Sequence, residues 1–244
     1  QLAWRFRITR EAMDEYALES QRRLGLAQSG SRLEEIEPLF DRDGNLYQVD
    51  DGYRPDSDMD KLARLRPVFD PPAGKVTAGN SAQVTDGAAW LLLASEAALE
   101  RHGLEPLGRF ADSRWAALAP SEMGLGPVHA MAPLLQDLNL DSGDVDYWEI
   151  NEAFAAQVLA CLEAWRSDDY CRRQFGFEHG FAAISRARLN VDGGAISLGH
   201  PVGASGARIV LHLLHVLRRE HAKRGIASLC VGGGQGGAVL VEIP

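Results

Sequence analysis

Apolar positions follow a helical period in several parts of the first hundred residues. From Thr9 to Gln28 they recur every three or four residues among charged ones, and Thr9 is a suitable cap, so an amphipathic surface helix is predicted. A shorter helix is predicted from Asp58 to Leu65. A third helix is predicted from Asp86 to His102, closed by Gly103, and its apolar and small residues indicate that it is buried.

A hairpin is predicted between the first two of these helices. Segments 33–40 and 46–49 flank the turn-forming residues 41–45, which include Asp43-Gly44. The acidic loop also suggests calcium, but its spacing stops short of the EF-hand pattern and the downstream Glu is absent. We therefore expect a turn here and no calcium site.

Strand and helix patterns alternate over the remainder of the chain. The predicted strands are 107–111, 146–150, 227–231 and 238–243, and the predicted helices are 128–138, 152–165 and 204–220. A long irregular stretch is expected up to Ala187. Alternation of this kind predicts a layered α/β fold.

Composition narrows the class of protein. Of the 244 residues, 45% are hydrophobic, which is ample for a core, and no apolar run approaches the roughly 20 residues that a membrane span needs. The net charge of −9 and the scattered Lys and Arg argue against a nucleic-acid surface. The amino terminus has neither an initiator Met nor a signal peptide, so the chain is expected to begin within a longer sequence.

The three cysteines form neither a disulfide framework nor a metal pattern, and we expect a reducing, cytoplasmic compartment. Cys161 lies on an apolar helical face and Cys171 in a charged loop, so a structural role is favoured for both. Cys230 differs, because it ends a strand directly before Gly232 and two further glycines. Their backbone amides could stabilise a thiolate or a developing oxyanion.

Two further polar residues lie where a strand or a glycine turn meets a helix. Asn151 directly follows the strand at 146–150, although by itself it could be only a helix cap. His200 precedes a proline amid glycines and is a better candidate for acid/base chemistry than the other histidines. His212 and His215 share a helix face without a third ligand, so no metal site is expected.

Together these segments resemble a known family. Asn-Glu-Ala-Phe at 151–154, Gly-His-Pro at 199–201 and Cys-Val-Gly-Gly-Gly at 230–234 are similar, in this order, to the carboxyl-terminal signatures of thiolases. Segments 9–21, 76–89 and 123–127 extend the resemblance over essentially the whole chain. It implies the layered thiolase fold, with residues 1–79 in the loop domain, 80–104 carrying the last helix of the amino-terminal domain and 105–244 forming the carboxyl-terminal domain.

The resemblance also implies roles in catalysis. His200 would take the proton of a nucleophilic cysteine, Asn151 would hold a water in one oxyanion hole, and the amide of Gly232 would contribute to another. Cys230 would shuttle the proton at the second substrate. The nucleophile itself belongs to the family's amino-terminal half, which we expect to be a separate or missing part.

For coenzyme A, the resemblance implies a phosphate contact at Arg54 and a pantetheine contact near Ser81. Met123 and Phe154 would lie on the substrate side. Coenzyme A is then a substrate, and neither a cofactor nor a metal is expected. The stretch 166–188 resembles an insertion of the fatty-acid-oxidation multienzyme type, although that type has His in place of Asn151, so acyl chain length stays open.

The expected function is thiolytic cleavage of 3-ketoacyl-CoA or the reverse Claisen condensation, in fatty-acid metabolism such as β-oxidation. The expected partners are acyl-CoA, the amino-terminal thiolase half and further copies in a homodimer or homotetramer. The alternative is a non-catalytic thiolase-fold subunit or acyl-CoA-binding scaffold. The intact motif residues count against that alternative.

Overall fold

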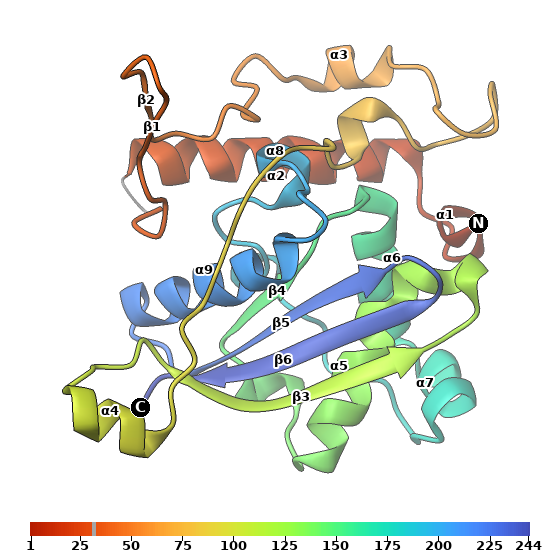
Figure 1. Cartoon of the computed structure of the whole chain (residues 1–244). Helices are drawn as coiled ribbons and strands as arrows, with labels where there is room; N and C mark the ends of the chain where they lie inside the picture. The colour runs from red at the N-terminus through yellow and green to blue at the C-terminus, as the bar shows by residue number, and fades with distance from the viewer. Residues whose placement is uncertain (31–32) are drawn as a thin grey trace.

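A four-stranded sheet organises the chain in the computed structural model, which describes residues 1–30 and 33–244 (Figure 1). Its strand order is β3-β6-β5-β4. The strands are β3 (Arg109–Ala117), β4 (Tyr147–Ile150), β5 (Arg224–Val231) and β6 (Gln235–Glu242). β4 and β5 are parallel, whereas β6 is antiparallel to both of its neighbours. The carboxyl ends of β4 and β5 therefore meet at one edge of the sheet.

Helices cover both faces of this sheet. Successive residues of β5 show the two sides: Ile226 packs in a cluster with α5 (Gly126–Asp137) and α6 (Ala155–Arg166), whereas Ala227 packs against α9 (Ser205–Arg219). Side chains alternate along a strand, so neighbouring residues face opposite layers. The result is a three-layer α/β arrangement (Figure 1).

The amino-terminal part lies over one end of these layers. α2 (Arg10–Ser29) contacts α6, the short helix α8 (Ala195–Leu198) and α3 (Met59–Ala63), as Figure 1 shows across the top of the view. Thr9 accepts a hydrogen bond from the amide of Ala12 and caps α2, as predicted. The buried side chains of α2 pack this long helix against the rest of the chain.

The smaller elements complete the chain order. They are α1 (Leu2–Arg5), β1 (Leu39–Phe40), β2 (Leu46–Tyr47) and the short 3₁₀ helices η1 (Ala78–Asn80), η2 (Pro120–Leu125), η3 (Ser142–Asp144) and η4 (Arg186–Arg188). β1 and β2 form the predicted hairpin, although it is short and exposed. α3 is the predicted short helix, capped by Asp58.

The prediction of a buried helix from Asp86 to His102 is wrong. Only α4 (Glu96–His102) is helical, capped by Ser95 and closed by Gly103 in the left-handed region. The preceding residues run as an extended segment between the η1 region and α4 (Figure 1), with Trp90 80% exposed. Helices in proteins are stabilised mainly by packing of an apolar face, and this segment is largely exposed among the described residues.

Two further expectations need correction. The stretch predicted to be irregular contains α7 (Asp168–Phe175), which begins after the capping residue Ser167 and ends at Gly176 in the left-handed region. Aromatic packing holds the region, and the rings of Trp165 and Phe181 stack with centroids 4.2 Å apart. β3 starts later and runs longer than predicted, because its pairing with β6 extends through an irregularity near Phe110.

None of the helices formed by the described residues has the length and apolar character to cross a membrane.

Candidate active site

The sheet edge where β4 and β5 end carries two of the predicted site residues. Ile150 pairs with Ser228 across the parallel strands, and the amide of Asn151 donates to the carbonyl of Ser228 over 2.9 Å. Cys230 lies two residues further along β5. Because neighbouring strands are about 4.8 Å apart, Asn151 and Cys230 belong to the same small region of this edge.

A glycine turn brings His200 to the same region. Gly199 has a φ of 94°, and a Cβ there would lie 2.4 Å from a side-chain carbon of Thr85, so glycine is required both by conformation and by space. The amide of His200 donates to the carbonyl of Gln83 over 2.8 Å. This hydrogen bond fixes the backbone from which the imidazole of His200 extends.

The imidazole of His200 has a polar partner on each nitrogen. Its Nδ1 lies 2.6 Å from Oγ of Ser205, and its Nε2 lies 3.4 Å from Nδ2 of Asn151. Asn151 is buried, and its Oδ1 has no hydrogen-bond partner among the described residues. A buried carbonyl oxygen without a donor is unfavourable, so this atom suits a water or a substrate group.

Electrostatics favour the neutral form of His200. Its pKa is lowered from 6.5, first by burial and second by the positive charge of Arg208. Arg208 also donates to the carbonyl of Gly199 over 2.9 Å. A neutral imidazole near neutral pH can accept a proton, which is the state that a general base requires.

Cys230 offers a protonated thiol beside an open glycine turn. The side chain is 9% exposed, and burial raises its pKa to about 11. Gly233 and Gly234 have φ values of 89° and 93°, which turn the chain sharply from β5 into β6. A Cβ at Gly232 would meet no atom within 4 Å, so the space beside its Cα is open.

The structure places His200 and Cys230 in one region without direct bonding between them. Within the part of the chain that is described, no hydrogen bond joins their side chains. Asn151 connects them, since it contacts His200 and shares the sheet edge with Cys230.

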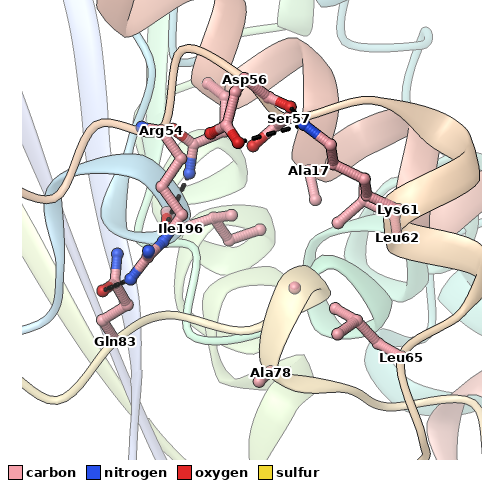
Figure 2. Close-up of a pocket in the computed structure, with 12 residues that line it drawn as sticks. Ala17, Arg54, Asp56, Ser57, Lys61, Leu62, Leu65, Ala78, Gln83 and Ile196 are labelled. Atoms are coloured by element: carbon pink, nitrogen blue, oxygen red, sulfur yellow. Dashed lines mark hydrogen bonds and ion pairs between the residues drawn. The ribbon is translucent and has the colours of Figure 1, made fainter.

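A cavity of about 520 Å³ is lined by Arg54, Lys61 and Gln83, among other residues (Figure 2). Figure 2 shows Arg54 directed towards Gln83, whose Oε1 accepts from the guanidinium over 2.7 Å, and Lys61 paired with Asp56 at 3.0 Å. Gln83 thus contacts a cation of the cavity through its side chain and His200 through its carbonyl. The cavity offers a cationic, partly apolar wall to an anionic ligand.

Comparison with known proteins identifies the family. The family model "Thiolase, C-terminal domain" matches residues 104–243, and "Thiolase, N-terminal domain" matches residues 1–97. The chain belongs to the thiolase family. The predicted family and its α/β fold are therefore confirmed.

Curated thiolases match almost the whole chain. It is 45% identical to the β-ketoadipyl-CoA thiolase of Pseudomonas aeruginosa over 241 residues, which cover 97% of this chain and 56% of the relative. It is 40% identical to human mitochondrial 3-ketoacyl-CoA thiolase over 245 residues, covering 99% and 57%. The chain thus spans a little over half the length of these thiolases.

Solved thiolase structures have the same arrangement. Human mitochondrial 3-ketoacyl-CoA thiolase in complex with CoA superposes with a TM-score of 0.85 at 38% identity, covering 100% of this chain and 57% of that one. The acetyl-CoA acetyltransferase of Bacillus anthracis gives a TM-score of 0.86 at 38% identity, covering 99% and 58%.

The residues predicted for coenzyme A in this thiolase chain lie in different places. Arg54 lines the cavity, whereas Ser81, Met123 and Phe154 are not among its lining residues. Ser81 pairs with Phe154 as an isolated bridge, and its hydroxyl donates to the carbonyl of Thr77 over 2.8 Å. Met123 is half-buried in η2. The structure therefore brings Ser81 and Phe154 together but leaves Arg54 and Met123 apart from them.

Sequence reasoning missed the role of Glu152 within the thiolase motif. Its buried carboxylate accepts from Tyr16 Oη at 2.9 Å and Asn190 Nδ2 at 3.0 Å on one oxygen. The other oxygen accepts from Ser20 Oγ at 2.7 Å and the amide of Ile196 at 3.2 Å. These contacts fasten α2 and α8 to the residue that follows Asn151.

Three other neighbours of the site were also missed. Ser205 lies in the glycine-rich segment that drew attention to His200, so its proximity was available as a signal. Arg208 lies one helical turn after the start of α9. Gln83 gives no signal in the sequence, because its contacts with Arg54 and His200 depend on how distant segments pack.

A separate buried cluster surrounds His212. Its ring pairs with Glu35 and lies 3.4 Å from Asp192 and 4.0 Å from Glu149. Among residues 1–30 and 33–244, no three side chains of the types that bind metals form a candidate site. His212 therefore belongs to an ion-pair network within this thiolase chain.

Proposed function

We propose that this protein is a thiolase-type acyl-CoA C-acyltransferase, which cleaves 3-ketoacyl-CoA with CoA or condenses acyl-CoA units in the reverse direction. The observation that carries the proposal is the meeting of His200, Asn151 and Cys230 at one sheet edge. Relatives of the chain are named as 3-ketoacyl-CoA and β-ketoadipyl-CoA thiolases, and one solved relative is in complex with CoA.

In the proposed mechanism, Nε2 of His200 accepts the proton of a nucleophilic cysteine. That cysteine would come from residues beyond those described, because the chain spans little more than half of its relatives. In cleavage the thiolate attacks the 3-keto carbonyl, and the bond between C2 and C3 breaks to leave an acyl group on the cysteine and an acyl-CoA carbanion. In condensation it attacks the thioester carbonyl and expels CoA, which takes the proton held by His200. In either direction a water held on Oδ1 of Asn151 helps to stabilise negative charge on oxygen.

Cys230 would handle the proton of the second substrate. Its raised pKa keeps the sulfur protonated, so it can donate to a leaving carbanion during cleavage and accept the proton back during condensation. The amide of Gly232, whose Cα lies beside open space, would stabilise the negative charge of the enolate. No cofactor is required for these steps, and CoA enters as a substrate.

Coenzyme A would occupy the cavity beside Arg54. The guanidinium suits a phosphate, and the apolar wall contributed by Leu62 and Leu65 suits the pantetheine chain. Ser81, Met123 and Phe154 would line the route towards the reacting atoms. The bridge between Ser81 and Phe154, which ends the motif at 151–154, supports this assignment for these two residues.

Exposed apolar side chains support an additional covering part. Trp90, Leu92 and Leu93 are each at least 75% exposed, and Trp115 on β3 is 67% exposed. Large apolar side chains exposed close together at 90–93 favour an interaction site in this segment. We assign the covering of this surface to an amino-terminal thiolase half and to other copies in a homodimer or homotetramer. The proposed domain boundaries are 1–79, 80–104 and 105–244.

The three cysteines are unpaired, which supports a cytoplasmic, reducing location. The named activities of the relatives support a role in fatty-acid β-oxidation.

Thiolysis of acetoacetyl-CoA by the full-length protein tests the proposal. His200→Ala and Cys230→Ala should each lower kcat by about 10³-fold, because each removes a proton-transfer group. Cys171→Ala, which changes a buried thiol of α7, should keep normal kcat. Arg54→Ala should raise the KM for CoA about tenfold, as loss of one charged hydrogen bond predicts.

Retained thiolysis in either alanine variant would refute the assigned roles. A full-length protein that binds CoA without turnover would instead indicate the scaffold function. The Cys171→Ala control separates loss of chemistry from general loss of a buried thiol.

A further inference from the structure

Ser205 contacts the base of the proposed reaction but has no part in the mechanism given above. It is the first residue of α9, and its side chain is fully buried. Its Oγ lies 2.6 Å from Nδ1 of His200 and 3.1 Å from the carbonyl oxygen of Pro201. A buried hydroxyl at these distances must distribute its single proton between two neighbours.

The proton on a neutral imidazole can be located by counting donors. If Nδ1 carries it, Nδ1 donates to Ser205, whose hydroxyl then donates to Pro201. Nε2 is left with a lone pair, which accepts from Nδ2 of Asn151. In this arrangement every observed contact has one donor and one acceptor.

The other tautomer loses contacts. If Nε2 carries the proton, it faces the amide nitrogen of Asn151, and two donors oppose each other unless that amide rotates. Rotation would exchange the two amide atoms and place the NH2 group of Asn151 where Oδ1 now lies. Oδ1 has no hydrogen-bond partner there among the described residues. The hydroxyl of Ser205 would also turn from Pro201 to Nδ1. The protonation site of a histidine is set by the partner of its other nitrogen, and here that partner is Ser205.

We propose that Ser205 is a positioning residue that keeps the proton of His200 on Nδ1 and thereby presents an unprotonated Nε2 to the reacting atoms. The location of the proton stands on the contacts alone, whereas its catalytic consequence rests on the proposed function. Without Ser205, the buried Nδ1 has no acceptor for its proton. The tautomer with the proton on Nε2 then becomes the more stable one. A protonated Nε2 can no longer act as a base.

Nitrogen-15 NMR of the full-length protein labelled in histidine tests where the proton lies. The signals of His200 are assigned by their loss in His200→Gln. In the unsubstituted protein Nδ1 should show the shift of a protonated nitrogen and Nε2 that of an unprotonated one. Ser205→Ala should reverse or mix the two, Ser205→Thr should restore the original pattern, and the signals of His212 on the same helix should stay unchanged.

Thiolysis of acetoacetyl-CoA tests the consequence. Ser205→Ala should lower kcat about 10- to 100-fold with little change in KM, because orientation by a neighbouring group has effects of this size. Ser205→Thr, which keeps the hydroxyl, should recover most of the loss. Unchanged kcat in Ser205→Ala would overturn the catalytic part.

The two experiments fail separately. A proton found on Nε2 of the unsubstituted protein, or an unaltered pattern in Ser205→Ala, would overturn the inference even in an active thiolase. Absence of thiolysis in the unsubstituted protein would refute the proposed function and the catalytic consequence, while the NMR result would still decide the tautomer.

Discussion

Replacement of Glu152 should show how strongly the site depends on one buried carboxylate. Each of its two oxygens accepts two hydrogen bonds, and in each pair one donor is a hydroxyl that can rotate and the other is an N–H that cannot. The fixed donors are the amide of Ile196 and Nδ2 of Asn190. The rotatable ones belong to Tyr16 and Ser20.

This geometry sets the cost of Glu152→Gln. The new NH2 group replaces one oxygen. In one orientation it opposes the amide of Ile196, which loses its acceptor. In the other it faces Nδ2 of Asn190, which keeps the carbonyl of Ile150 as an acceptor, while the hydroxyl of Tyr16 loses its own. One buried donor therefore loses its acceptor, at a cost of about 1–3 kcal/mol in the free energy of unfolding. Glu152→Ala removes both oxygens and leaves a cavity, so about 3–5 kcal/mol is expected.

Urea unfolding of the full-length protein, followed by tryptophan fluorescence at one protein concentration, measures both losses. Glu163→Gln is the matched control on α6, because Glu163 is an exposed partner of Arg166 and should contribute less than about 1 kcal/mol. Equal unfolding midpoints for Glu152→Gln and Glu163→Gln would refute the assigned donor arrangement. A Glu152→Ala variant as stable as the unsubstituted protein would refute the importance of the network.

Two pH-dependent effects are also expected. Burial raises the pKa of Glu149 from 4.5 to about 8, so the folded state holds a proton that the unfolded state releases, and stability should fall as pH rises from 4.5 to about 8. Glu149→Gln should flatten this fall in thermal unfolding midpoints, and a stability that rises with pH over the interval would contradict the assignment. Arg208→Met should raise the pKa of His200 and move the acid limb of the kcat profile upward by about half a pH unit, whereas Arg208→Lys should not. An unmoved limb in Arg208→Met would exclude electrostatic control by this residue.

Local signals in the sequence predicted several elements well. Thr9 and Asp58 are capping residues whose hydrogen bonds lie within one helical turn, so the helices that they begin can be recognised without the rest of the fold. The turn around Asp43-Gly44 is equally local. The roles predicted for Asn151 and His200 came from family resemblance, since neither residue alone distinguishes a site from a cap or a structural histidine.

Tertiary packing determines the secondary structure of the segments that were predicted wrongly. The apolar residues from Ala88 to Ala94 suit a helix by composition, but they remain extended and largely exposed in the described chain. Conversely, the polar segment of α7 looked irregular, although Ser167 and Gly176 provide both of its end signals. Its aromatic residues contribute the packing that stabilises it. Propensity is a weak guide wherever tertiary contacts outweigh it.

The contacts around the site also explain why its parts cannot act as separate modules. Tyr16 and Ser20 of α2 donate to Glu152 beside Asn151, and the carbonyl of Gln83 holds the backbone of His200. Some of the groups that orient the carboxyl-terminal residues therefore come from the first 83 residues of the chain. A ligand that moves Arg54 would act on Gln83 and through it on His200, so occupation of the cavity and alignment of the base are physically connected.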